Sequence, residues 1–251
     1  MQRIAVLADI HADWSALSSV ARAIEGAGID RVWCLGDWVS GGGQPRRVFD
    51  WVMAHCERIL AGNHEVFVMG RAWERPGARG EDLTAAAVAF RQLGRARVDR
   101  LYGLPAYALT DHAELVHGAL TGPVDGFLTG RVHAERNLWL LSRPLLLFAH
   151  THQPVLWEPA ARPGALRRRI RLGVGYELAL TEDPADRRLL NPGAVCDRDG
   201  ARWLELRLAD DHASVIAAWH QTKVASRVGK VSSPPARGRP RSVTSAVNAR
   251  G

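Results

Sequence analysis

Residues 3–11 read RIAVLADIH, a short apolar run that ends in an aspartate and a histidine. Residues 32–37 (VWCLGD) and 58–64 (RILAGNH) repeat this arrangement, an apolar run followed at once by polar side chains. Apolar residues at helical spacing over 14–25, and a second helical stretch at about 45–55, lie between the runs. The order strand, helix, strand, helix, strand predicts a largely parallel sheet covered by helices.

The rest of the sequence predicts further helices and a second set of strands. Residues 81–102 and 131–142 are expected to be helical. Strands are expected at 114–117, 145–148, 166–172, 176–180, 187–191, 202–208 and 213–219. The later segments are short and separated by Gly, Pro and Asp, as in antiparallel sheets. We therefore expect a second sheet packed on the first, giving a sandwich with outer helices.

The positive charge of the chain is concentrated at its C-terminal end. The sequence has 251 residues, 33 of them basic and 26 acidic, and a formal net charge of +7. Seven basic residues follow the last acidic one, Asp211, so residues 1–211 are formally neutral. We expect a folded domain at 1–220 and a disordered basic tail at 221–251, because the tail has too few large apolar residues to form a core. Nucleic acid is expected to bind at most weakly and non-specifically, through this tail.

Several protein classes are disfavoured by what the sequence lacks. No apolar run approaches the roughly 20 residues that cross a bilayer, and the N-terminal segment does not resemble a signal peptide. The three cysteines are far apart and form no CxxC motif, which favours neither a disulfide framework nor a cysteine-based zinc site: Cys34, Cys56 and Cys196. We expect a cytoplasmic protein that does not contact membranes. The sequence leaves the oligomeric state open.

Seven potential metal ligands follow five of the predicted strands. In chain order they are Asp9, His11, Asp37, Asn63, His117, His150 and His152. Ligands in open α/β sheets gather beyond the carboxyl ends of the strands, so these side chains are expected to converge. Within residues 9–11 and 150–152, an extended backbone would place the two polar side chains on the same side, where each pair could bind one ion.

The chemistry of this set suits two divalent cations of borderline softness, because it offers imidazoles, carboxylates and one amide oxygen but no thiolate. A carboxylate such as Asp37 can bridge two ions about 3.5–4 Å apart. Bridged ions lower the pKa of a shared water and supply a hydroxide near neutral pH. His64 adjoins Asn63 and could reach the reacting group without binding metal. The sequence therefore predicts a two-metal hydrolytic site.

Five sequence blocks resemble, in order, those of the calcineurin-like metallophosphoesterase superfamily. They are Asp9-Ile10-His11, Gly36-Asp37, Gly62-Asn63-His64-Glu65, Val116-His117-Gly118 and His150-Thr151-His152. Residues 191–195 (NPGAV) are similar to a further block of the small bacterial and archaeal phosphodiesterase-type members, so that the resemblance covers about residues 1–208. It implies an α/β (α+β) fold, a four-layer double β-sandwich flanked by helices. It also implies a metal-dependent phosphoesterase, which is a hydrolase.

The same resemblance implies a role for each site residue. Asp9, His11, Asp37 and His152 would hold the first metal. Asp37, Asn63, His117 and His150 would hold the second. Mn²⁺ is the expected metal, with Fe and Zn²⁺ as alternatives. A hydroxide bridging the metals would attack phosphorus while His64, as general acid, protonates the leaving oxygen. The expected substrate is a phosphodiester or a small phosphomonoester, with nucleotides among the candidates.

Three other functions stay open on the sequence. Protein phosphatases and the related dinucleoside tetraphosphatases carry Gly-Asp-x-Val-Asp-Arg-Gly, whose arginine clamps phosphate, whereas this chain has Gly41 at that position. A non-catalytic scaffold with the same fold is disfavoured because the ligand set and His64 are complete. A nuclease acting on polymeric nucleic acid is disfavoured by the formally neutral body of the chain.

Overall fold

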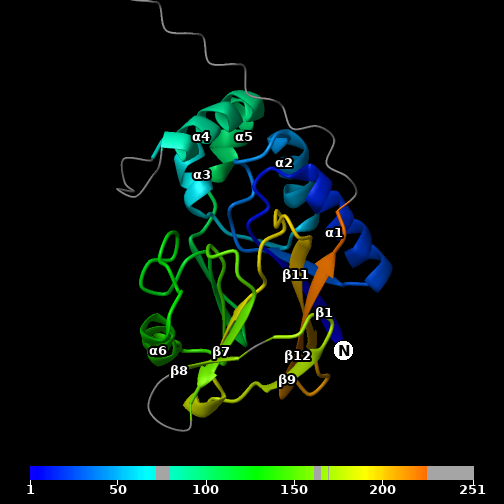
Figure 1. Cartoon of the computed structure of the whole chain (residues 1–251), viewed down its shortest axis with the longest axis vertical. Coiled ribbons are helices and arrows are strands. Elements are labelled where there is room, and N and C mark those ends of the chain that lie inside the picture. The colour runs from blue at the N-terminus through cyan, green and yellow to red at the C-terminus, as the bar shows by residue number, and fades with distance from the viewer. Residues whose placement is uncertain (72–79, 161–164, 169, 225–251) are drawn as a thin grey trace, which may run out of the picture.

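Two six-stranded sheets pack face to face, with helices on both outer sides (Figure 1). The computed structural model describes residues 1–71, 80–160, 165–168 and 170–224. The first sheet has the strand order β3-β2-β1-β11-β12-β9, formed by β1 (Gln2–Leu7), β2 (Arg31–Cys34), β3 (Arg58–Ile59), β9 (Gly175–Ala179), β11 (Ala201–Leu208) and β12 (Ser214–Thr222). The second has the order β4-β5-β6-β10-β7-β8, formed by β4 (Tyr107–Leu109), β5 (Ala113–Val116), β6 (Leu145–Leu147), β7 (Val155–Pro159), β8 (Ala165–Arg168) and β10 (Arg188–Asn191).

The helices cover the two outer faces and one end of the sandwich. They are α1 (Trp14–Ala27), α2 (Pro45–His55), α3 (Asn63–Val68), α4 (Gly80–Leu93), α5 (Arg95–Leu101) and α6 (Arg131–Leu140), with a short 3-10 turn at Pro184–Asp186. In Figure 1, α1 lies outside the first sheet and α6 outside the second, while α3, α4 and α5 gather beside α2 at the top. Helix α1 begins where the Asp13 side chain accepts a hydrogen bond from the Ala16 N–H, 3.0 Å away. It ends at Gly28, whose φ of 65° is the left-handed conformation that suits glycine.

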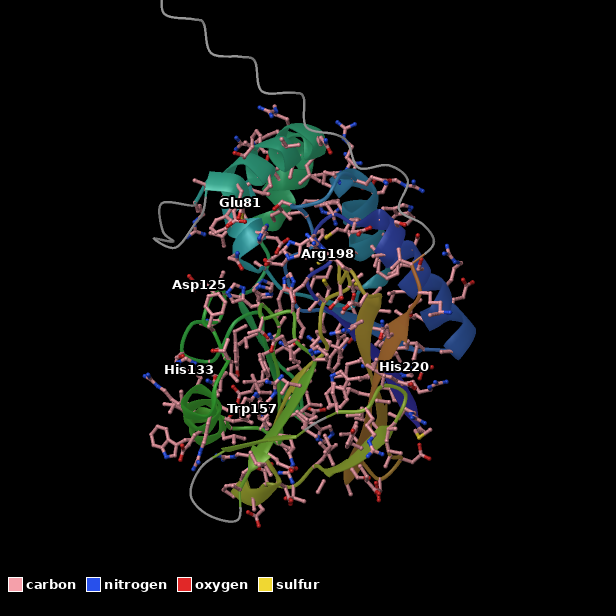
Figure 2. The ribbon with its side chains drawn as sticks, viewed as in Figure 1. Glu81, Asp125, His133, Trp157, Arg198 and His220 are labelled. Atoms are coloured by element: carbon pink, nitrogen blue, oxygen red, sulfur yellow. The ribbon has the colours of Figure 1, made fainter. Side chains whose placement is uncertain are left out.

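Three apolar clusters hold these layers together. Between the sheets, Val6 and Leu35 of the first sheet pack in one cluster with Leu147 and Leu190 of the second. A second cluster joins helices α1 to α5 to the outer face of the first sheet. A third joins α6 to the outer face of the second sheet and includes Trp157 of β7, which is labelled in Figure 2. The order helix, sheet, sheet, helix is the predicted four-layer sandwich.

The strands that precede the predicted ligands run parallel in each sheet. In the first sheet β1 pairs with β2 and β2 with β3, all parallel, and Cys34 is opposite both Leu7 and Ile59. In the second sheet β5 pairs with β6, also parallel, and Leu115 is opposite Leu147. The carboxyl ends of these strands are therefore aligned, and the loops that follow them emerge together at one end of the sandwich.

Most of the helices and strands lie where the sequence predicts them, but β4, β7 and α3 were not predicted, and two predicted features differ from the structure. The helix expected over 81–102 is two helices, because Gly94 adopts a φ of 76° and ends the first. The late strands do not all join the second sheet: β11 pairs antiparallel with β1, and β12 and β9 follow it. The first sheet is therefore mixed rather than largely parallel. Val6 is opposite Leu204 across the β1–β11 pair, so that β11 contributes to the same inter-sheet cluster.

The described part of the chain holds no helix of the length and apolar character that a membrane span requires. Strand β12 ends at Thr222, so the expected boundary at residue 220 falls inside it. Most of the expected tail, from residue 225 to 251, lies outside the described residues.

Candidate active site

The seven predicted ligands and His64 all lie at the carboxyl ends of the parallel strands. Asp9 and His11 follow β1, and Asp37 follows β2. Asn63 and His64 open α3 just after β3, His117 follows β5, and His150 and His152 follow β6. Figure 2 labels Asp125 and Arg198 at this same end, on the loops that follow β5 and β10. Both sheets therefore contribute side chains to one site.

The backbone at the site is left-handed where the sequence predicted extended segments. Positive φ angles occur at Asp9 (51°), His11 (50°), Ala12 (55°), Asp37 (54°), His150 (66°) and His152 (59°). The expectation that residues 9–11 and 150–152 are extended is therefore wrong. Such angles cost about 1–3 kcal/mol each in a residue other than glycine, so they persist only where the surroundings impose them.

Hydrogen bonds between the loops impose this backbone. The Asp9 N–H donates to the Gly36 carbonyl (3.1 Å), and the His11 N–H donates to the Asp37 carbonyl (2.9 Å). Across the second sheet, the Ala149 N–H donates to the His117 carbonyl (2.8 Å). The loops are therefore tied to one another as well as to their own strands.

One group of potential metal ligands consists of Asp37, His117 and His150. Their ligand atoms lie within 4.8 Å of one another. Nε2 of His117 is 3.2 Å from Oδ2 of Asp37. The other ring nitrogen, Nδ1, donates to the Leu35 carbonyl at 2.9 Å, which directs Nε2 into the site. Burial lowers the pKa of His117, but the neighbouring Asp37 carboxylate offsets this and raises it to about 9.

A second group of potential metal ligands consists of Asp9, His11 and His152. Nε2 of His11 is 3.1 Å from Nε2 of His152, which in turn is 3.5 Å from Oδ1 of Asp9. Burial lowers the pKa of His11 to about 3, so this imidazole is neutral at pH 7. Burial also raises the pKa of Asp9 to about 6. Asp37 lies between the groups, with Oδ2 also 4.0 Å from Nε2 of His11.

Buried polar atoms that lack a hydrogen-bond partner indicate whether these residues suit metal ions. Among the described residues, four such atoms belong to predicted ligands: Oδ1 and Oδ2 of Asp9, Oδ1 of Asn63 and Nε2 of His150. Buried polar atoms nearly always have a hydrogen-bond partner, and their clustering here requires another explanation. Carboxylate, amide and imidazole donors in this arrangement fit divalent cations.

Comparison with known proteins agrees with this geometry. The family model of the calcineurin-like phosphoesterases matches residues 2–171. The chain belongs to this family. The crystal structure of a metallophosphoesterase from Sphaerobacter thermophilus is similar over 88% of this chain and 90% of that one, with 26% identity and a TM-score of 0.70.

Two archaeal proteins are also similar. The structure of PH1004 from Pyrococcus horikoshii has the same fold, with 16% identity, a TM-score of 0.67 and coverage of 90% of this chain and 89% of that one. The uncharacterized protein MJ0912 from Methanocaldococcus jannaschii is 36% identical over 69 residues, which are 27% of this chain and 28% of that protein. This chain thus spans only a little over a quarter of the length of this last relative.

Glu65 fixes the loop that carries Asp37. Its fully buried carboxylate accepts hydrogen bonds from four backbone N–H groups, at 2.8–3.0 Å: those of Asp37, Trp38, Val39 and Gly62. Burial raises the pKa of this carboxyl. The sequence placed Glu65 within a family block without giving it a role.

Asn191 fixes the turn that carries His150 and His152. Its side-chain amide donates to the Ala149 carbonyl (2.9 Å) and to the Thr151 hydroxyl (3.2 Å). The side-chain oxygen accepts from the Gly193 N–H at 2.8 Å. The similarity of residues 191–195 to a family block therefore has a structural basis, since the first residue of the block supports two predicted ligands.

Three residues at the site were missed by sequence reasoning. The Ser40 hydroxyl is 2.7 Å from Nδ1 of His64. The Cys196 thiol lies with ligand atoms of His11 and His152, all within 4.8 Å of one another. The ring of Phe127, which is 59% exposed, has its centroid 4.2 Å from that of His150. Neither Ser40 nor Phe127 belongs to a motif, and Cys196 looked like an isolated structural thiol.

Proposed function

We propose that this phosphoesterase is a dinuclear-metal-dependent hydrolase of phosphodiesters or small phosphomonoesters, nucleotides included. The observation that carries the proposal is the set of buried potential ligand atoms without a hydrogen-bond partner on Asp9, Asn63 and His150, next to the close pair of His117 and Asp37. These atoms come from both sheets and meet at the carboxyl ends of parallel strands.

Each predicted ligand keeps the role that the family resemblance implies. Asp9, His11, Asp37 and His152 would hold one cation, and Asp37, Asn63, His117 and His150 the other. Asp37 is suited to both because its Oδ2 lies near Nε2 of His117 and near Nε2 of His11. When bound, two such cations polarise phosphoryl oxygens and lower the pKa of water, and Mn²⁺, Fe and Zn²⁺ all suit these donors.

His64 is the proposed general acid. Its backbone N–H donates to Oδ1 of Asp37 (2.9 Å), and its ring nitrogen Nδ1 is 2.7 Å from the Ser40 hydroxyl. With Nδ1 engaged, Nε2 is the atom left to deliver a proton to the leaving oxygen. Nε2 is 4.0 Å from Oδ2 of Asp37, so this proton is held beside the proposed metal-bridging carboxylate.

The loop after β2 argues against the protein phosphatase and dinucleoside tetraphosphatase alternative. Gly41 replaces the arginine that clamps phosphate in those enzymes, and its φ of 110° favours glycine. A Cβ atom at this position would lie 3.1 Å from Cβ and Nδ1 of His11. An arginine at this place would strain the backbone and press on His11, and without it the phosphate must be bound in another way.

Metal content measured together with activity tests the proposal. The protein is purified without chelator, its metals are counted, and bis-p-nitrophenyl phosphate and p-nitrophenyl phosphate are assayed with added Mn²⁺. We expect about two metals per chain and turnover that disappears on chelation. Metal without turnover on either compound or on a nucleotide panel would favour the scaffold alternative. Absence of metal would overturn the proposal.

A further inference from the structure

A cysteine adjoins the half of the site formed by Asp9, His11 and His152. The thiol sulfur of Cys196 and the ligand atoms of His11 and His152 lie within 4.8 Å of one another. Cys196 is half-buried on the loop between β10 and β11, distant in sequence from both histidines.

The loop that carries Cys196 is held against the end of β1. The Cys196 N–H donates to the Asp9 carbonyl (3.1 Å), and the Val195 N–H donates to the Ala8 carbonyl (3.0 Å). On the other side, the Arg202 N–H donates to the Ala194 carbonyl (3.0 Å), and the Arg202 guanidinium is 3.3 Å from Oδ2 of Asp197. The backbone of Cys196 is therefore held against the segment that carries Asp9.

An independent observation indicates that a cation belongs beside this thiol. Asp9 is fully buried, and neither carboxylate oxygen has a hydrogen-bond partner among the described residues. Its Oδ1 lies 3.5 Å from Nε2 of His152, which is 3.1 Å from Nε2 of His11. The buried Asp9 carboxylate and the Nε2 atoms of His11 and His152 thus lie close together, next to the loop that carries Cys196.

We infer that Cys196 is an additional ligand of the first metal, binding as a thiolate beside Asp9, His11 and His152. The inference rests on the proposed metal site. On binding, the thiol loses its proton to solvent and the sulfur donates an electron pair to the cation, with no change of oxidation state. Thiolate ligands favour Zn²⁺ and iron over Mn²⁺, so the two metal positions differ in selectivity and the first prefers the softer ion.

Cobalt substitution tests the inference without relying on catalysis. Apoprotein of the full chain is titrated with Co²⁺, bound cobalt is counted, and the near-ultraviolet sulfur-to-cobalt charge-transfer band is recorded. The wild type is compared with Cys196→Ser, Cys196→Ala and, as a matched control, Cys56→Ser, whose sulfur lies at the end of α2. Circular dichroism and thermal melting check that each variant is folded.

We expect the band in the wild type and in Cys56→Ser, and its loss in both Cys196 variants, which still bind cobalt. We also expect the preference for Zn²⁺ over Mn²⁺ at one position to fall by at least about tenfold in these variants, since even outer partners of a ligand change affinity about 10–100-fold. Two bound cobalt ions without the band in the wild type, or a band retained in a Cys196 variant, would overturn the inference but leave the metal site intact. A wild type that binds no cobalt would overturn both.

Discussion

The hydroxyl of Ser40 lies 2.7 Å from Nδ1 of His64, across the site from the second sheet. Ser40 is fully buried, and its own carbonyl accepts from Nδ1 of His11 at 3.1 Å. One residue of the loop after β2 therefore orients both a predicted metal ligand and the proposed acid. The conformation of this loop depends on Glu65, whose carboxylate accepts hydrogen bonds from the backbone N–H groups of the first residues of the loop.

Replacing Ser40 by alanine should lower kcat with little change in KM. The imidazole of His64 loses one hydrogen bond, worth about 0.5–1.5 kcal/mol, which corresponds to a rate change of about 2- to 10-fold. Steady-state kinetics of Ser40→Ala on an alkyl phosphodiester measures the effect. Ser18→Ala, which removes a hydroxyl bonded within α1, is the control. An unchanged kcat would show that His64 does not need this partner.

Replacing His64 by alanine should retain the bound metal and abolish most turnover. A general acid contributes about 10²- to 10⁴-fold, and the loss should be smallest for p-nitrophenyl esters because that leaving group needs no proton. Metal counting and parallel assays of an alkyl and an aryl ester measure both effects. If the variant equals the wild type on the alkyl ester, His64 is not the acid.

Adding a methyl group at Gly41 should disturb the site, whereas the same change at Gly43 should not. The Cβ at Gly41 would lie 3.1 Å from the His11 ring on a left-handed backbone, while nothing lies within 4 Å of a Cβ at Gly43. We expect Gly41→Ala to lose about 1–3 kcal/mol of unfolding free energy and to bind the first metal more weakly. Thermal melting and metal titration of the two variants test this. Equal behaviour would mean that the loop relaxes freely.

Glu205 should make the free energy of unfolding decrease at acidic pH. The buried carboxylate of this β11 residue accepts from Nε of Arg3 (2.8 Å) and is 3.0 Å from Nε2 of His220. Burial raises the pKa of Glu205, but these partners outweigh it and hold the pKa below its ordinary value. A depressed folded pKa stabilises the fold above the unfolded pKa of about 4.3, and this contribution is lost as the pH falls below that value.

The corresponding variant is Glu205→Gln. We expect it to lose about 1–3 kcal/mol of unfolding free energy at pH 7 and to differ less from the wild type near pH 4. Urea unfolding at the two pH values measures this, with the exposed Glu182→Gln as control. If the variant and the wild type differ in unfolding free energy by the same amount at both pH values, the charge of Glu205 does not stabilise the contact between β1, β11 and β12.

The convergence of the predicted ligands could be predicted where polar residues follow the ends of strands. Asp9, Asp37 and His117 directly follow apolar runs, and parallel pairing then brings them together. The sandwich was predictable for the same reason, because the runs that form its core are short and regularly interrupted. Sequence periodicity indicates which face of a strand is buried, and this information was enough to predict the layered sandwich.

The conformation of the loops could not be predicted in this way. The left-handed angles at His11 and His150 depend on hydrogen bonds to residues far along the chain, and single residues carry no sign of them. The same holds for Cys196, which comes near His11 only because β11 pairs with β1 and carries its loop to the site. Antiparallel partners are chosen by packing across the sheet, and short strands of similar composition do not reveal that choice.

The left-handed backbone at Asp9, His11, Asp37, His150 and His152 has a consequence for engineering. Glycine or asparagine would relieve strain at these five places, whereas the proposed metal site needs the residues that are there. On the proposed function, a laboratory selection for heat resistance alone would therefore enrich substitutions at the predicted ligands and yield a more stable but inactive protein. Stabilising this protein without loss of the proposed activity requires that these positions stay constant and that substitutions are sought elsewhere.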